Sequence, residues 1–154
     1  MNAQRAELEA QLLANPRFVL GVTGSRNWTS RRSVWIPATT MLRHHRRIAV
    51  RNGMCRRGVD RFMHEWAEKF DSSVVLEIPH VADWSPDNRA AGFLRNQEMV
   101  NAGMDALMAW ALPCAKRTRW CPAGEHPSHG TADCVEKARE AGIPIHFSPE
   151  GMSW

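Results

Sequence analysis

The sequence predicts an α/β fold: a Rossmann-like, doubly wound sheet, mainly parallel, with about five strands and helices on both faces. Short apolar runs rich in β-branched residues alternate with longer segments of helical periodicity, a pattern typical of βαβ units. The chain has 154 residues, of which 44% are hydrophobic and 23% charged, as in an ordinary globular domain. We therefore expect a single domain over residues 1–154.

Five apolar runs predict the strands, because each is short and is bounded by Gly, Pro or polar residues. They are "RFVLGVTG" (17–24), "RIAVRNG" (47–53), "SVVLEIPH" (73–80), "MDALMAWAL" (104–112) and "IPIHFSP" (143–149).

Helical spacing predicts helices over 1–16, 30–47, 58–70, 89–103 and 129–142. The clearest lies in 58–70, where Val59, Phe62, Met63, Trp66 and Phe70 share a face. Pro37, near the start of 30–47, is compatible with a first helical turn, where a missing N–H is tolerated.

The N-terminal segment lacks the basic-then-apolar layout of a signal peptide, and no run of about 18 apolar residues is present. We expect a cytoplasmic protein with no membrane partner. The net charge is +4, and 17 of the 20 basic residues are Arg. Phosphate recognition explains this excess, because the Arg fork matches phosphate oxygens, but so does the codon bias of a GC-rich genome.

Small residues and helix starts gather where the predicted strands end. Gly24-Ser25-Arg26 follows the first strand, Gly53, Gly58 and Asp60 surround the end of the second, and Gly130-Thr131 opens the last helix. Gly lets a ligand approach the backbone, and a helix N-terminus presents free N–H groups, so together they favour a phosphate. Neither Gly-x-Gly-x-x-Gly nor a Walker loop is present.

Five ordered motifs stand at these positions: Thr23-Gly24-Ser25-Arg26 with Trp28 nearby; "NGMCRRGVD" (52–60); Ala82-Asp83-Trp84; Ala91-Gly92 with Arg95, Asn96 and Met99; and Gly130-Thr131-Ala132-Asp133. Over residues 17–147 the chain resembles the SLOG superfamily of Rossmann-like proteins, in particular its YspA/YpsA-related bacterial and phage branch. The resemblance implies a pocket for a nucleotide or nucleotide-derived ligand, a homodimer or higher homo-oligomer, and compatibility with a phage origin.

The ligand-binding candidates are Gly24, Ser25, Arg26, Trp28, Gly53, Gly58, Asp60, Arg95, Asn96, Gly130 and Thr131. Some have structural alternatives. Asp60 either holds a ribose hydroxyl or caps its helix, and Arg95 either faces the ligand or pairs with Asp83. Trp28 either stacks on a base or covers the sheet edge, whereas Trp84 is expected to pack in the core or a loop.

Three functions follow in order of preference. The first is a sensor or sequestering protein for a nucleotide-derived ligand. The second is an N-glycosidase or phosphoribohydrolase, implied by a distant similarity to the lonely guy phosphoribohydrolases, with Arg95 and Asp133 as catalytic residues. The third is a nucleic-acid binder, suggested by "RHHRRIAVR" (43–51) and "CAKRTRW" (114–120); it ranks last, so nucleic acid is not expected as a partner.

The irregular segment 113–128 interrupts the αβ alternation. Cys114, Cys121, His126 and His129 have the residue types of a tetrahedral zinc site, although their spacing is unusual. The hypothesis is a structural zinc ion that orders the loop; the alternative is a mobile Arg-rich loop with incidental thiols. Cys134 is the least suitable ligand, because it lies one turn into the last helix.

Overall fold

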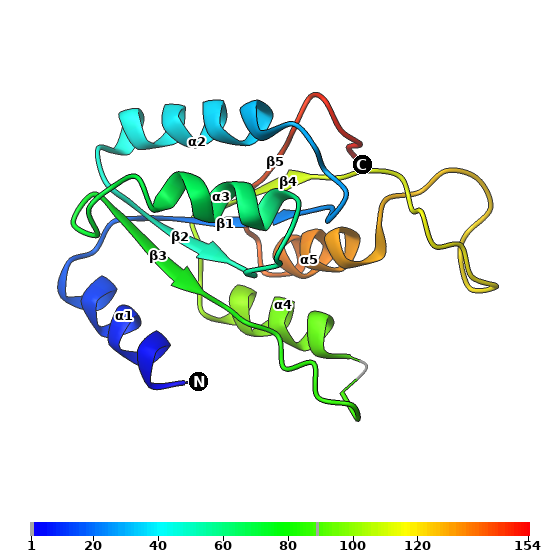
Figure 1. Cartoon of the computed structure of the whole chain (residues 1–154), viewed down its shortest axis with the longest axis horizontal. Coiled ribbons are helices and arrows are strands. Elements are labelled where there is room, and N and C mark those ends of the chain that lie inside the picture. Colours follow the sequence, from blue (N-terminus) through cyan, green and yellow to red (C-terminus); the bar gives the residue numbers. More distant parts are fainter. Residues whose placement is uncertain (1, 89) are drawn as a thin grey trace.

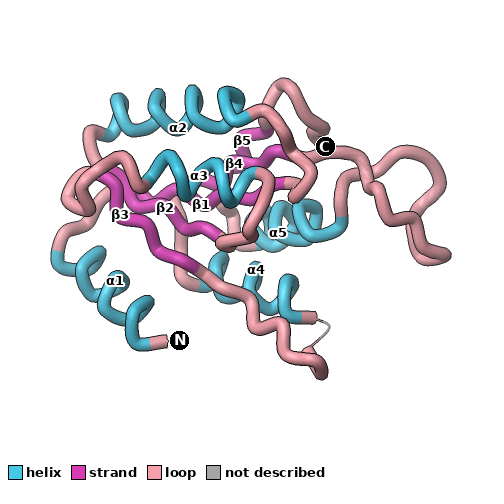
Figure 2. Tube along the Cα trace, in the orientation of Figure 1, coloured by secondary structure: helices cyan, strands magenta, loops and turns pink. Residues whose placement is uncertain are grey.

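The computed structural model describes residues 2–88 and 90–154 and forms one five-stranded parallel sheet. The strands are β1 (Phe18–Gly24), β2 (Ile48–Asn52), β3 (Val75–Pro79), β4 (Ala106–Trp110) and β5 (Ile145–Phe147). Their order across the sheet is β3-β2-β1-β4-β5, with the longest strand in the middle (Figure 2). The predicted α/β doubly wound fold is therefore confirmed, and the sheet is parallel throughout.

The described residues form five helices, of which the first precedes β1 and the other four connect successive strands: α1 (Ala3–Ala14), α2 (Arg31–His45), α3 (Val59–Ala67), α4 (Ala91–Asn101) and α5 (His129–Glu140). Helices α2 and α3 cover one face of the sheet, and α1, α4 and α5 lie on the other (Figure 1). The predicted starts at Met1 and Arg89 lie outside the described residues. Within the described ranges, none of the helices combines the length and apolar character needed to cross a bilayer.

Strand β4 shows how the alternating pattern builds two cores. Ala106 and Trp110 point to the α2–α3 face, where they pack with Leu20 and Val34. Leu107 and Ala109 alternate with them, point to the opposite face and pack against α4 and α5. Because both faces of the sheet are buried, its strands read as continuous apolar runs. Each fully buried large apolar side chain contributes about 1.5–3 kcal/mol.

The position of Pro37 differs from the prediction. Helix α2 begins at Arg31, with Ser30 as N-cap, so Pro37 lies in the interior of the helix rather than in its first turn. A proline there leaves the carbonyl four residues earlier, that of Ser33, without its helical donor. The indole N–H of Trp110 donates to that carbonyl oxygen at 2.9 Å. A side chain from the sheet thus replaces the missing backbone bond, which no local pattern predicts.

A buried arginine in β2 connects α1 to the sheet. Arg51 is only 1% exposed and donates to the Glu9 carboxylate and to the carbonyl oxygens of Ala102 and Gly103. His80 lies against the same guanidinium, with Nε2 3.2 Å from Arg51 Nη1. Burial, together with the charges of neighbouring arginines, lowers the pKa of His80 to about 3. His80 is therefore neutral at physiological pH.

Candidate functional site

A cavity of about 540 Å³ opens at the carboxyl ends of the strands. It lies over the ends of β1 and β2 and against the starts of α4 and α5. The chain runs outward from β1 to β3 and then crosses to β4, so β1 and β4 flank the point where the strand order reverses. Open α/β sheets bind their ligands at such a switch point. This cavity is the candidate site.

Most of the predicted ligand-binding residues line this cavity. They are Gly24, Ser25, Arg26, Gly53, Asp60, Arg95, Asn96, Gly130 and Thr131. They come from four separate segments of the sequence, and the parallel sheet brings them to one edge.

Two predicted residues do not line the cavity. Trp28 is 5% exposed and belongs to the core, where its indole N–H donates to the carbonyl of Ser30 and the hydroxyl of Ser33. The proposed stacking role of Trp28 is therefore wrong. Gly58 has a structural role: its φ is +73°, and a Cβ there would come within 2.4 Å of the Ser25 carbonyl oxygen. Glycine at this position lets the loop after β2 lie in contact with the loop after β1.

Trp84 lies where one of the two alternatives for Trp28, stacking on a base, would have placed an aromatic ring. Its side chain lines the cavity and is 56% exposed, contrary to the expectation of core or loop packing. Phe93, which the sequence analysis did not single out, lines the same cavity. The Arg26 guanidinium lies 5.4 Å from the Trp84 ring centroid, a cation–π distance. The Ala82-Asp83-Trp84 motif was the available signal for this side chain.

The charge of the cavity is mainly positive. Its lining contains Arg26, Arg57, Arg95 and Lys116, whereas Asp60 is the only carboxylate among the described lining residues. Asp60 is buried, and its Oδ2 accepts the backbone N–H of Cys55 at 3.1 Å. Burial raises the pKa of Asp60, and the nearby Arg95 opposes the rise. An incoming anion would meet a surplus of cations.

Arg95 is held toward the end of β2. Its Nη1 donates to the carbonyl oxygen of Gly53 at 2.6 Å, and its Nε donates to Asn96 Oδ1 at 3.0 Å. The alternative partner, Asp83, instead accepts the backbone N–H of Ser85. A Cβ on Gly53 would lie 2.2 Å from Arg95 Nη1, so the glycine leaves room for the guanidinium.

Asn96 joins α4 to the start of α5. Its amide donates to the carbonyl of Gly130 at 3.1 Å and to the Asp133 carboxylate at 2.9 Å. Asp133 also pairs with Lys137 at 2.8 Å and is not part of the cavity lining. Of the two predicted catalytic residues, Arg95 lines the cavity. Asp133 lies outside the lining and pairs with Asn96 and Lys137.

The N-terminus of α5 faces the cavity without a side-chain cap. Ser128 is the N-cap residue, but its hydroxyl contacts Ser25 Oγ and Thr131 Oγ1 instead of a backbone N–H. A Cβ added to Gly130 would meet no atom within 4 Å. The first-turn N–H groups of a helix have no intrahelical acceptor, so this open end favours an anion.

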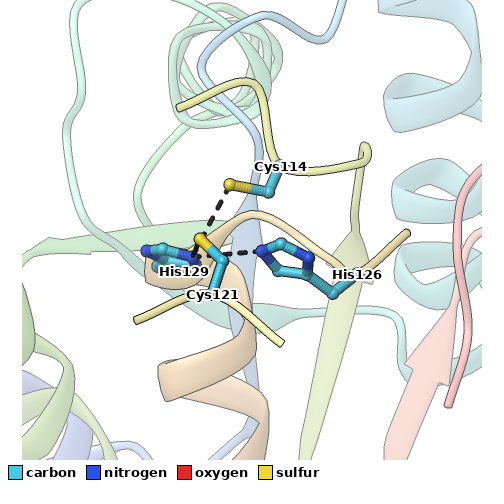
Figure 3. Close-up of side chains that lie close together, drawn as sticks. All are labelled: Cys114, Cys121, His126 and His129. Carbon is cyan, nitrogen blue, oxygen red and sulfur yellow. Dashed lines mark hydrogen bonds between the residues drawn. The ribbon is translucent and has the colours of Figure 1, made fainter. Parts of the chain in front are cut away.

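A cluster of two cysteines and two histidines lies at the rim of the cavity. The ligand atoms of Cys114, Cys121, His126 and His129 all lie within 4.8 Å of one another. Nε2 of His129 is 3.6 Å from Cys114 Sγ, 3.4 Å from Cys121 Sγ and 3.3 Å from His126 Nε2 (Figure 3). The cluster can hold a metal ion, and it contains the four residues that the sequence indicated.

The cysteine of α5 differs from those of the cluster. Cys134 is fully buried in α5 and lies outside the cluster, and burial raises its pKa to about 12. Hydrogen bonds, first of all from the Thr118 backbone N–H, lower the pKa of Cys121 to about 6. Cys121 therefore favours the thiolate, which is the form that binds metals.

The cluster and the cavity share two residues. Cys114 and His129 belong to the cluster and also line the cavity, and His129 is the first residue of α5. Any ion held by the cluster would thus fix the cavity wall. The sequence does not reveal that the two sites adjoin, because nothing in the spacing shows that segment 113–128 folds back along the strand ends.

Comparison with the profiles of known protein families gives no match. The chain is 36% identical over 131 residues to the "Gene 61 protein" of Mycobacterium phage D29, covering 80% of this chain and 90% of the phage protein. The chain belongs to the family of this phage protein. The sequence motifs are compatible with a phage origin. The similarity to the Gene 61 protein agrees with that expectation.

Proposed function

We propose that this protein binds a phosphate-bearing, nucleotide-derived ligand in the cavity and acts as a sensor or sequestering protein. One observation carries the proposal: four cationic side chains and the uncapped start of α5 surround a cavity that contains a single carboxylate among its described lining residues. Phosphate groups are the common ligands of such an arrangement. The cavity volume of about 540 Å³ is in the range of small-molecule sites.

The non-phosphate part of the ligand has suitable contacts as well. Trp84 and Phe93 offer aromatic faces for a base at the cavity lining. Asp60 offers a buried carboxylate that can accept a ribose hydroxyl, the role that the sequence analysis weighed against helix capping. The backbone N–H of Cys55 already binds one oxygen of Asp60, and this bond orients the carboxylate.

The proposal is tested with the purified full chain and a panel of nucleoside monophosphates, adenosine diphosphate ribose, its cyclic isomers and nicotinamide dinucleotides. A ligand at a hundred times its dissociation constant stabilises the protein by about 2.7 kcal/mol, a visible rise in Tm. Arg95→Ala should remove the shift, whereas Arg43→Ala, on an exposed turn of α2 remote from the cavity, should keep it. No shift with any compound would contradict nucleotide binding, and shifts of equal size in both variants would show that the ligand does not bind at Arg95.

The hydrolase alternative has weaker support. Its carboxylate, Asp133, pairs with Lys137 and Asn96 and does not line the cavity. Chromatography of the best-binding compound after incubation decides between the alternatives: an intact ligand supports the sensor, and a released base supports the hydrolase. Asp133→Asn is the matched variant, because it should abolish cleavage only if Asp133 is catalytic.

We further propose that the Cys114–Cys121–His126–His129 cluster binds a structural zinc ion. With Zn–S bonds of about 2.3 Å and Zn–N bonds of about 2.0–2.1 Å, tetrahedral ligands lie about 3.3–3.8 Å apart. The three separations measured around His129, 3.3–3.6 Å, match these values. Two thiolates and two imidazoles suit zinc better than magnesium or calcium, which prefer oxygen ligands.

Metal content of the purified protein tests the zinc proposal. One zinc per chain is expected for the parent protein and for Cys134→Ser, because Cys134 lies outside the cluster. Cys121→Ser should lose most of the metal. Equal zinc content in Cys121→Ser and Cys134→Ser would rule out this site.

A further inference from the structure

The loop between Cys114 and Cys121 extends from the body of the molecule (Figure 1). Residues 115–120 are all exposed, and they include Lys116, Arg117, Arg119 and Trp120. The four residues of the metal cluster lie at the base of this loop and of the return segment 122–128. The segment "AKRTRW" (115–120) is therefore a basic loop tip with one aromatic side chain, and the four cluster residues lie close together where the loop begins and ends.

Trp120 is 80% exposed, more than the other exposed tryptophans, Trp84 and Trp154. The Arg119 guanidinium lies 4.7 Å from the Trp120 ring centroid. Arg117 is held in the loop by donating to the carbonyl of Pro122 at 2.8 Å. No salt bridge is formed by Arg117 or Arg119 within the described parts of the chain, so their charges are available to a partner.

We propose that this tip, residues 115–120, is a binding surface for single-stranded nucleic acid. Proteins hold single strands by combining cations that follow the phosphates with aromatic side chains on which bases stack. Arg117 and Arg119 supply the cations, and Trp120 supplies an accessible ring one residue from a guanidinium. The side chains that carry this function, Arg117, Arg119 and Trp120, do not line the cavity, although Ala115 and Lys116 at the start of the tip do.

An acidic protein segment would also be attracted by the charges of the tip. It would gain little from an exposed indole, whereas every base has a π-face that stacks on one. The duplex is also a poorer fit, since its bases are already stacked on one another. From the sequence alone nucleic acid ranks last, because basic runs are usually solvated surface. The structure adds two observations: Trp120 is exposed, and the cluster residues lie close together where the loop begins and ends.

The test uses the full-length, zinc-loaded protein and a short fluorescein-labelled oligothymidylate, with binding followed by anisotropy at several salt concentrations. Trp120→Ala should weaken binding about ten-fold through lost stacking. The double variant Arg117→Ala/Arg119→Ala should reduce the slope of log K against log salt by about 1.4, because each single-strand phosphate contact contributes about 0.7. Zinc content, measured in parallel, should stay that of the parent.

The matched control removes two charges elsewhere. Arg32 on α2 and Lys69 just after α3 are exposed, so Arg32→Ala/Lys69→Ala lowers the net charge equally and should leave the affinity and slope close to those of the parent. The proposal is overturned if the parent does not bind at low salt, if the control weakens binding as much as the loop variants, or if Trp120→Ala binds like the parent. Displacement of the oligonucleotide by equimolar polyglutamate would assign the tip to an acidic protein instead.

Discussion

The indole N–H of Trp110 donates to the carbonyl oxygen of Ser33, the group that Pro37 leaves without its backbone donor. Trp110 ends β4, whereas Ser33 and Pro37 lie in α2, so the bond joins the sheet to the helix. Trp110 is buried, and removing a donor from a buried carbonyl costs about 1–3 kcal/mol. The bond therefore stabilises a helix that its own sequence interrupts.

A double-mutant cycle measures this bond. Trp110→Phe should destabilise the parent protein more than it destabilises the Pro37→Ala variant, because an alanine at this position restores a backbone donor for Ser33. We expect a coupling of about 1 kcal/mol in the free energy of urea unfolding. Strictly additive effects of Trp110→Phe and Pro37→Ala would show that the indole bond does not compensate for the proline.

Two glycines at the site should respond in opposite ways to alanine. Gly58→Ala forces a side chain into a φ of +73° and against the Ser25 carbonyl oxygen, so we expect a loss of at least about 1–3 kcal/mol in unfolding free energy. Gly130 lies in α5 with open space around its Cβ position. Gly130→Ala should keep or raise stability, by up to about 1 kcal/mol, yet weaken ligand binding by blocking the backbone.

Thermal unfolding and ligand titration of both variants check this contrast. If Gly130→Ala binds the ligand as tightly as the parent, the ligand does not approach the start of α5. If Gly58→Ala has the Tm of the parent, the contact between the two loops is not needed for folding.

Stability should rise with pH through the titration of His80. Its ordinary pKa is 6.5, and its pKa in the folded protein is about 3, because burial and neighbouring arginines disfavour the charged form. Between these values the unfolded chain binds a proton that the folded chain does not. The contribution of neutral His80 is thus present above pH 6.5 and is lost as the pH falls toward 3, with a slope of up to about 1.4 kcal/mol per pH unit.

Urea unfolding between about pH 4 and 7 tests this dependence. His80→Gln should flatten the curve, whereas His146→Gln, which changes an exposed residue of β5, should leave it unchanged. Parallel curves for the parent and His80→Gln would show that His80 does not cause the dependence.

If the proposed zinc ion is bound, its removal should affect both the loop and the cavity. A chelator should lower the Tm and speed tryptic cleavage after Arg117 and Arg119, because the base of the loop is released. Ligand affinity should fall at the same time, since Cys114 and His129 line the cavity as well as the metal cluster. Unchanged ligand affinity in the metal-free protein would show that the ion orders only the loop.

The amino-acid sequence by itself determined the order and type of the helices and strands, because apolar periodicity and Gly or Pro boundaries are local properties. It also placed most of the cavity residues, for a simple reason: the carboxyl ends of parallel strands meet at one edge, so residues that follow them gather there. Gly24, Arg26 and Asp60 were found in this way.

Tertiary structure alone decided which tryptophan faces the cavity. Trp28 and Trp84 both follow strand ends, but the path of each loop buries the first and exposes the second. It also decided that Pro37 is tolerated inside α2, because Trp110 arrives from a distant strand. The metal cluster is intermediate: the residue types were visible in the sequence, but only the folding-back of 113–128 brings Cys114 and His129 to 3.6 Å. Contacts between segments far apart in the chain depend on the path of the backbone, and the pattern of neighbouring residues does not determine that path.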